Sequence, residues 1–285
     1  MSRLKPYLFI APALLVIALI FFYPVAEVLR TSMLRVSGRT STFVGLGNYR
    51  SLFQDEVFLA AIRHNARMLL AVPVLLGLSL ALGVLLFEGA AGVRFYRTVL
   101  FLPYIISIPV VGIVFGYIFQ LNGILNQLLR AAGLGALAAD WLGSSRFALW
   151  TIMGVVVWKE FGFGVVLFLA RLMSVDEELY EAARIEGAGW LQVLVRITIP
   201  QLATVIEFFV VIMIMTMLSW VFNYVYVMTS GGPGNSTMVT EYYVYLMGFR
   251  YNLQGPAAAA SIVLLAVTVV LILARANISR RIELG

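Results

Sequence analysis

The sequence predicts an all-α membrane protein with six transmembrane helices. Its 285 residues are 62% hydrophobic and 12% charged, about half the charged share of an ordinary soluble domain. A spanning helix needs about 20 predominantly apolar residues. Six segments meet that requirement, at about 7–26, 66–87, 98–119, 147–170, 202–228 and 257–274. We therefore expect a single transmembrane domain over residues 1–285.

The first of these segments follows Arg3 and Lys5, as the apolar run of a signal peptide does. Its apolar run is long for such a peptide and no clean small-residue cleavage site closes it, so we expect an uncleaved helix. An even number of spans places both termini on one side of the membrane. Lysine and arginine are nearly equally numerous on the two sides, so their distribution leaves open which side is cytoplasmic.

Several kinds of catalytic and metal site are excluded by residue type. The chain has no cysteine, and its one histidine, His64, is more typical of a structural residue than of a metal ligand. Neither lysine, Lys5 nor Lys159, closes the glycine-rich loop that binds nucleotide phosphates. We expect no catalytic residues, no bound metal and no nucleic-acid partner, and any ATP must bind another subunit.

Lys159 and Glu160 are two charged residues in the middle of the fourth apolar segment. A charge at that depth costs about 2.5–3.5 kcal/mol on insertion scales. Because consecutive side chains point about 100° apart on a helix, we do not expect the two simply to neutralise each other. They either form a polar lining of a transport path or join a buried network with neighbouring helices.

The fifth segment carries a polar stripe whose members are three or four residues apart: Thr216, Ser219, Asn223 and Tyr226. An aromatic ring beside an amide suits a sugar, which offers C–H faces and hydroxyl edges. The stripe either faces a substrate path or forms a packing seam between helices. The candidate path residues are Ser219, Trp220, Asn223 and Tyr224, with Lys159 and Glu160 behind them.

The loop at 171–201 contains the charged stretch Glu-Ala-Ala-Arg-Ile-Glu-Gly-Ala-Gly, residues 181–189. Ser174 and Glu177 match a capping box at the start of a helix. Gly187 and Gly189 predict a corner, and a second helical stretch, 190–199, should stop at Pro200.

The loop's first predicted helix, with its acidic end and its small Ala182 and Ala183, has the shape of an element that docks into a partner. A solvated connector would explain the charge. It would not explain the alanine pair together with the two glycines.

The loop resembles the EAA loop of ABC-transporter inner-membrane permeases. The matching positions are Glu181-Ala-Ala, Gly187-Ala188 and Ile197-x-Ile199-Pro200. Three positions depart conservatively from the family pattern: Glu186 stands for the usual Asp, Ile199 for Leu, and Leu194 where Phe is common. Three further stretches are similar to the sugar-type permeases related to the maltose-transporter membrane subunits: 43–49, 158–163 and 222–233, with Asn223 where that family has Asp or Asn.

The resemblance implies a type I ABC importer permease fold in a bacterial or archaeal cytoplasmic membrane, with both termini and the loop cytoplasmic. It also implies a second homologous permease, two ATPase subunits that bind ATP and Mg, and an extracytoplasmic solute-binding protein. In this interpretation the loop couples to the ATPase through Glu181, Ala182, Ala183, Glu186 and Gly187.

The expected function is thus a permease subunit that forms the path for a sugar, oligosaccharide or polyol phosphate. One alternative is a secondary transporter driven by an ion gradient, with Lys159, Glu160 and Glu207 as relay groups. Such transporters often contain internal repeats, and no convincing repeat is present. A membrane enzyme is a further alternative, for which no catalytic constellation is found.

Overall fold

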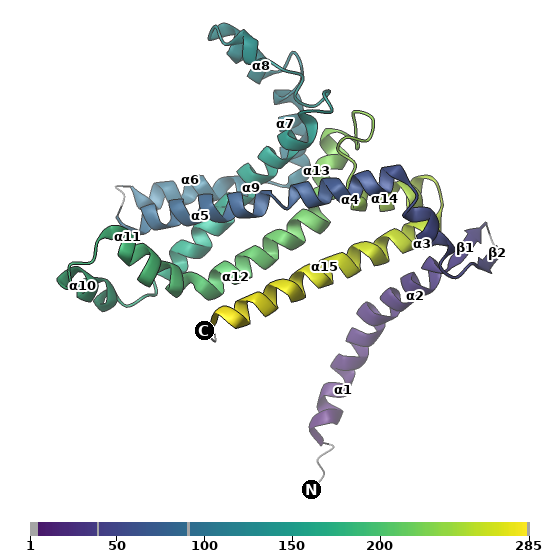
Figure 1. Cartoon of the computed structure of the whole chain (residues 1–285), viewed down its shortest axis with the longest axis horizontal. Coiled ribbons are helices and arrows are strands. Elements are labelled where there is room, and N and C mark those ends of the chain that lie inside the picture. The colour runs from purple at the N-terminus through teal and green to yellow at the C-terminus, as the bar shows by residue number, and fades with distance from the viewer. Residues whose placement is uncertain (1–4, 39, 90–91, 284–285) are drawn as a thin grey trace. The chain divides into compact units, whose positions relative to one another are not determined.

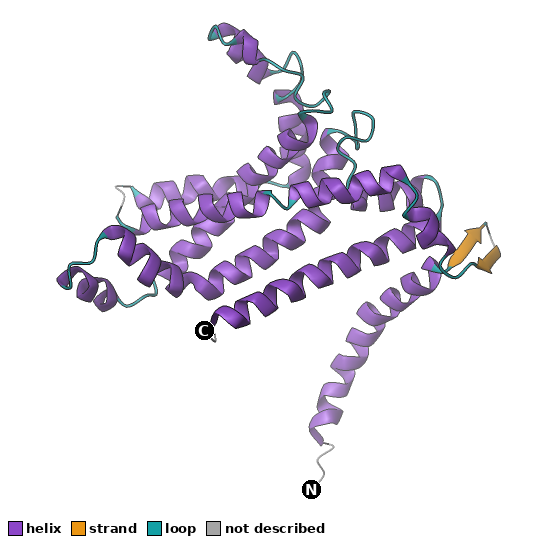
Figure 2. Ribbon diagram, viewed as in Figure 1, coloured by secondary structure: helices purple, strands orange, loops and turns teal. Residues whose placement is uncertain are grey.

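The computed structural model describes residues 5–38, 40–89 and 92–283, which are mostly helical (Figures 1 and 2). Fifteen α-helices and one two-stranded sheet occur in these residues. Five helical stretches are long and apolar enough to cross a membrane: Phe9–Ser32, Glu56–Phe87, Ala148–Leu172, Trp190–Met228 and Gln254–Ala274. A sixth span consists of two helices, Val93–Ile105 and Ile108–Ile118. The six spans follow the six predicted segments in order.

The contacts divide the chain into two compact units, Met1–Leu59 with Thr240–Val269, and Ala60–Val239 with Val270–Gly285. Each unit has its own set of packed elements. The single transmembrane domain over residues 1–285 stays a prediction. So does the expected common side of the two termini, which depends on residues 1–4 and 284–285, outside the described part of the chain.

The first unit opens with a long helix. It runs through α1 (Lys5–Ile17), a π-helical turn (Ala18–Phe22) and α2 (Tyr23–Ser32), so it ends later than the predicted 7–26 segment. An antiparallel hairpin follows, made of β1 (Leu34–Ser37) and β2 (Thr40–Phe43), and then the short helix α3 (Gly47–Leu52).

Asn48 joins the end of this first helix to the hairpin. Its buried side-chain amide donates to the carbonyl oxygens of Ser32 at 2.8 Å and Leu34 at 2.9 Å. The Tyr49 and Ser32 hydroxyls are 2.7 Å apart. The motif at 43–49 therefore has a structural role, since its Asn and Tyr satisfy backbone and hydroxyl groups where the helix ends.

Asp55 begins the next helix, α4 (Glu56–Met68), by accepting the backbone N–H groups of Val57 at 2.8 Å and Phe58 at 3.3 Å. The Tyr243 hydroxyl of α14 (Thr240–Tyr245) donates to the same carboxylate at 2.7 Å. Burial, then the Asp55 hydrogen bond, raise the pKa of Tyr243 far above its ordinary value. The chain continues through a π-helical turn (Leu246–Arg250) into α15 (Gln254–Glu283).

The central helix of the second unit is α9 (Ala148–Leu172), in which 61% of the spanning window is buried. Helix α5 (Ala71–Phe87) packs closely along it because each helix has a glycine at the contact, Gly83 in α5 and Gly164 in α9. A Cβ atom at Gly164 would lie 2.5 Å from the Ser79 hydroxyl oxygen, so only glycine leaves room for this approach. The Ser79 hydroxyl donates to the Phe161 carbonyl at 2.8 Å.

The third span is broken, and the prediction of one helix over 98–119 is wrong. Helix α6 (Val93–Ile105) and helix α7 (Ile108–Ile118) meet at an angle of 94°. Between them Ile106 and Ser107 have extended backbone, with ψ of 135° and 142°. Pro109 lies in the first turn of α7, where its missing N–H is not needed, so a new helix starts there readily.

Beyond α7 a compact loop contains α8 (Ile124–Ala131) and a 3₁₀ turn (Gly135–Leu137). The fully buried Asn126 organises it, donating to the carbonyls of Leu121 at 3.0 Å and Ala139 at 2.7 Å. Its side-chain oxygen accepts the Trp141 indole N–H at 2.9 Å. The loop is thus a folded element, although the sequence predicts no helix in it.

The fifth span is longer than predicted and runs without interruption from Trp190 to Met228. It consists of α11 (Trp190–Val193), α12 (Ile199–Met215) and α13 (Val221–Met228), linked by π-helical turns at Leu194–Thr198 and Thr216–Trp220. The prediction that the helix would stop at Pro200 is wrong. The first π-helical turn precedes Pro200 and shifts the hydrogen-bond register, which accommodates a residue without an N–H.

Candidate coupling loop and intramembrane site

The two ends of the predicted 171–201 loop are joined to each other. The Arg171 guanidinium donates to the Gln201 carbonyl at 3.1 Å and to its side-chain oxygen at 3.0 Å. The predicted capping role of Ser174 is wrong, because its hydroxyl donates to the Arg171 carbonyl at 2.7 Å and accepts from the Arg171 guanidinium at 2.9 Å. Ser174 is therefore bound to the end of α9, and Asp176 is the residue that precedes the loop helix.

The loop helix is α10 (Glu177–Ile185), with Glu177 and Glu178 in its first turn, where the helix dipole favours anions. It ends in a Schellman motif: the Ala188 N–H donates to the Ala183 carbonyl at 2.9 Å and the Gly187 N–H to Arg184 at 3.1 Å. Gly187 has φ of +74°, which confirms the predicted corner. Gly189 is extended and starts α11 instead.

The two alanines of the loop lie on different faces of α10. Ala183 is buried together with Tyr180, whose ring packs 5.4 Å from the Phe87 ring. Ala182 is exposed, so the predicted small-residue face contains one alanine and not two, as consecutive helical positions require. The exposed face consists of Glu178, Glu181, Ala182 and Ile185, and Glu186 and Gly187 are exposed beyond it.

A cavity of about 780 Å³ lies behind this helix, between α10, the last turns of α5 and α9, and the start of the fifth span. Leu172 and Thr198 line it, and the Trp190 indole donates to the Glu88 carboxylate at its edge. The buried Tyr180 hydroxyl also lines it and has no hydrogen-bond partner among the described residues. Helix α10 is therefore held by few side-chain contacts over partly open space.

The candidate path residues of the fifth span divide between two faces. Ser219 and Trp220 are exposed, and Asn223 is half-buried with its amide 3.4 Å from the Trp220 carbonyl. Tyr224 is fully buried on the other face. Three of the four fifth-span candidates thus lie on a face that this chain leaves uncovered. Ser219 and Trp220 end the π-helical turn that leads into α13 and Asn223 lies in its first turn, so we call these three residues the α13 face.

Lys159 and Glu160 are buried, with 5% and 6% of their surface exposed, and of the two interpretations the structure supports the buried network. The Lys159 ammonium donates to the Tyr104 carbonyl at 3.0 Å and lies 5.0 Å from the centre of the Tyr104 ring. It is also 3.6 Å from Glu160 Oε1, so the expectation that the two do not neutralise each other is wrong. Both side chains are long enough to bend together. The Tyr224 hydroxyl donates to Glu160 at 3.2 Å.

The structure therefore brings together Lys159, Glu160 and Tyr224, with Tyr104 as a partner that sequence reasoning missed. The available signal was the pair Pro103 and Pro109 within an apolar run, which is typical of a broken helix. His64 makes a structural contact, with its Nδ1 2.8 Å from the Met238 carbonyl. Among the described residues no cluster of histidine or carboxylate side chains could hold a metal ion.

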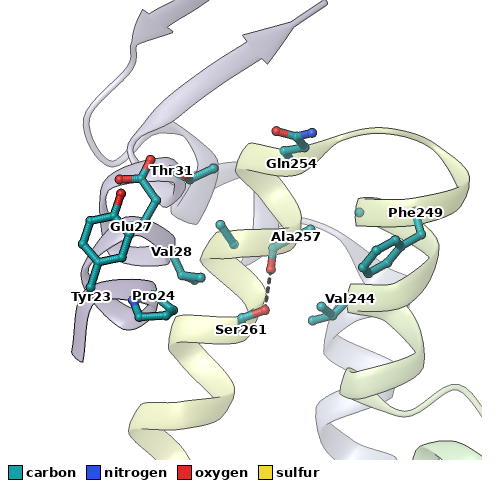
Figure 3. A pocket seen from close by; sticks show the side chains of 12 residues that line it. Tyr23, Pro24, Glu27, Val28, Thr31, Val244, Phe249, Gln254, Ala257 and Ser261 are labelled. Carbon is teal, nitrogen blue, oxygen red and sulfur yellow. Dashed lines mark hydrogen bonds between the residues drawn. The ribbon is translucent and has the colours of Figure 1, made fainter. Parts of the chain in front are cut away.

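The first unit contains a groove of about 560 Å³ between α2 on one side and α14 and α15 on the other (Figure 3). Small residues of the π-helical turn at Leu246–Arg250 and of α15 are among those that line it, namely Gly248, Ala257, Ala258 and Ser261. Glu27 is at its rim and is paired with Arg30 at 3.0 Å. The neighbouring first span has none of its spanning window buried within this chain.

Comparison with known families gives a match over residues 73–284 to the family described as "Binding-protein-dependent transport system inner membrane component". The match covers the fourth and fifth spans, the broken third span and the whole 171–201 loop. The family consists of transport components and not of enzymes. It also does not favour the alternative of an ion-gradient-driven transporter.

Individual proteins are similar over most of the chain. A probable ABC transporter permease, YurN of Bacillus subtilis, is 36% identical over 276 residues, covering 95% of this chain and 94% of that protein. The diacetylchitobiose uptake permease NgcF of Streptomyces coelicolor is 36% identical, covering 80% and 68%. A crystal structure of a bacterial alginate ABC transporter, in complex with its pentasaccharide-bound periplasmic protein, contains a chain with a TM-score of 0.84 and 25% identity, covering 97% and 94%.

Proposed function

Because the chain belongs to the family of inner membrane components of binding-protein-dependent transport systems, we propose that it forms part of a carbohydrate path and receives energy through α10. The observation that carries this proposal is the geometry of the loop. The Arg171–Gln201 hydrogen bonds join the two ends of the loop, and the Schellman motif at Gly187 ends its short acidic helix. The face of this helix that contains Glu178, Glu181, Ala182 and Ile185 is exposed. Such a face is available to a partner protein.

In the coupling step, α10 would dock on a cytoplasmic ATPase subunit that binds ATP and Mg. Glu181 would supply charge to a basic partner group, and Ala182 would permit close contact. Gly187 would set the exit angle of the chain, while Ala183 acts from the inner face by packing α10 on the unit. Closure of two ATPase subunits would displace α10 and shift the balance between inward- and outward-facing states.

The α13 face supports a carbohydrate as the solute. Trp220 is 58% exposed beside Ser219 and Asn223, which combines an apolar ring with hydroxyl and amide groups. The relatives named for diacetylchitobiose and alginate transport saccharides, which favours the same class here. Tyr224, Lys159 and Glu160 lie behind this face and would support it without contacting the solute.

A second permease subunit fits the uncovered part of the first unit. The exposed first span would otherwise face lipid alone, and the small residues that line the groove of Figure 3 permit close helix packing. A solute-binding protein would deliver the sugar from the opposite side of the membrane to α10. In this arrangement the 171–201 loop and both termini would lie in the cytoplasm.

The test is reconstitution of the permease, its cognate partner permease and ATPase in vesicles with the solute-binding protein. We expect saccharide uptake that requires ATP and is lost on Glu181→Lys, because the charge presented to the ATPase is reversed. Glu207→Gln, a change in a candidate relay group of the ion-driven alternative, should leave ATP-driven uptake intact. Uptake by this chain alone, indifferent to ATP and to Glu181→Lys, would refute the proposal.

A further inference from the structure

The break in the third span leaves backbone groups without helical partners at membrane depth. The last carbonyls of a helix have no partners within it, and α6 ends at Ile105. Water is scarce in the hydrocarbon region, where each unsatisfied backbone group costs several kcal/mol. A bend of 94° at this place therefore requires groups from another element to hold it.

Lys159 supplies one such group from α9. Its ammonium donates to the Tyr104 carbonyl, in the last turn of α6, at 3.0 Å. A positive charge at this end also complements the negative end of the α6 dipole. The ammonium lies 5.0 Å from the centre of the Tyr104 ring, within the range of a cation–π contact.

Glu160 balances this charge and extends the network to the fifth span. Its carboxylate is 3.6 Å from the ammonium and accepts the Tyr224 hydroxyl of α13 at 3.2 Å. One cluster thus joins α6, α9 and α13. Its neutrality also makes it compatible with burial, because each charge has an opposite charge and a hydrogen-bonding partner.

Glycines also bring the two halves of the broken span against the helices that this cluster joins, α6 against α9 and α7 against α13. A Cβ at Gly162 of α9 would overlap the Leu100 carbonyl oxygen of α6 and come within 2.9 Å of its carbon. A Cβ at Gly112 of α7 would be 3.0 Å from a Val227 methyl group of α13. Helix α6 is therefore packed on α9 and helix α7 on α13. The charged cluster connects these two packed pairs, because it joins α9 to α13.

We propose that Lys159 is a positioning residue that holds the bend of the third span in register with α13. By binding the carbonyl end of α6, and Tyr224 through Glu160, it makes the bend and the α13 face move as one body during transport. It does so without touching the solute. This inference rests on the proposed function, since it assigns Lys159 a part in the same transport cycle.

The test uses a thiol introduced by Ser107→Cys, which lies in the bend of a chain that has no cysteine. The full transporter is labelled in vesicles with a small thiol reagent, in three backgrounds: unchanged, Lys159→Arg, and Lys159→Met with Glu160→Gln. The double change removes both charges together, so no uncompensated charge is left to unfold the protein. Thr151→Val, which removes a hydroxyl contact near the N-terminal end of α9, is the matched control.

We expect the double change to alter the labelling rate at position 107 about tenfold, as for the loss of one charge-assisted hydrogen bond. Lys159→Arg should restore the original rate and Thr151→Val should not alter it. Equal rates with and without the double change, including no reaction in either, would overturn the proposal. So would a change of equal size in Thr151→Val, because Lys159 would then have no special role.

Sugar taken up per ATP hydrolysed is the second measurement. We expect the double change to lower this ratio while the ATPase subunits still purify with the permease, because α10 is untouched. An unchanged ratio would overturn the role in transport. The two proposals can fail separately. Absence of ATP-driven uptake by the unchanged protein would refute the proposed function. The labelling rates do not depend on transport, so they would still decide whether Lys159 positions the bend.

Discussion

The acidic helix α10 and the charged pair in α9 hold their charges in opposite ways. In α10 the carboxylates of Glu178 and Glu181 are exposed, and the geometry is set by backbone hydrogen bonds around Gly187. In α9 the side chains of Lys159 and Glu160 are almost fully buried and set the geometry themselves. Substitutions in α10 should therefore change coupling with little loss of stability, whereas substitutions in the pair should reduce stability first.

The largest effect is expected for Lys159→Met alone. It leaves the Glu160 carboxylate buried without its cation, a loss of about 3–5 kcal/mol in the free energy of unfolding. The measurement is thermal unfolding in detergent, with Lys159→Met and Glu160→Gln combined as the control. If the single change is as stable as the combined one, the pair is not the buried ion pair described above.

Gly162→Ala should follow, because its methyl group would overlap the Leu100 carbonyl and push α6 from α9. Overpacking of this kind costs about 1–3 kcal/mol. Gly154→Ala is a matched control in the same helix, where a Cβ meets nothing within 4 Å. There we expect equal or higher stability, since alanine favours the helix. Equal losses for both variants would show that α6 and α9 are not in close contact.

Gly187→Val tests the other region. Valine is strained at φ of +74°, by about 1–2 kcal/mol, so the corner after α10 should open while the spans remain folded. We expect an intact melting transition and ATP hydrolysis no longer coupled to uptake. Gly189→Ala, at an ordinary φ of −71°, should keep coupling. Normal transport by Gly187→Val would show that the corner does not set the docking angle.

Asn223→Ala should have the smallest effect on stability, within about 0.5 kcal/mol, because its side chain is half-buried and makes one weak contact. We expect uptake to need about fivefold more solute-loaded binding protein, as for one lost hydrogen bond. Met215→Leu, at an exposed apolar position of the same span, should leave uptake unchanged. An equal loss in both would remove Asn223 from the path.

The six spans could be predicted because each is an apolar run of sufficient length. The corner after α10 could be predicted because glycine adopts a positive φ at a helix end more readily than any other residue. The bend of the third span was missed, although Pro103 and Pro109 signalled it, because the run is apolar throughout. Pro200 led to the opposite error, because we predicted a helix end there and the helix continues. A π-helical turn before it accommodates the missing N–H, and single-sequence patterns do not reveal such turns.

The side-chain partners were harder to predict than the elements. Ser174 fits a capping box, yet Arg171, three residues earlier, competes for its hydroxyl. Lys159 and Glu160 were recognised as unusual, but their partners Tyr104 and Tyr224 are far away in the chain. Long-range contacts of this kind depend on how the spans pack together. The residue periodicity within one span carries no information about that packing.

The central claim is that energy reaches this permease through the exposed face of α10. Its most direct test is a thiol introduced by Ala182→Cys, modified with a benzophenone photo-crosslinker, in the assembled transporter. The account predicts cross-links to the ATPase subunit that change when ATP is added, and none from Ala136→Cys, an exposed position in the loop that contains α8. No cross-link from position 182, or equal cross-linking from both positions, would contradict it.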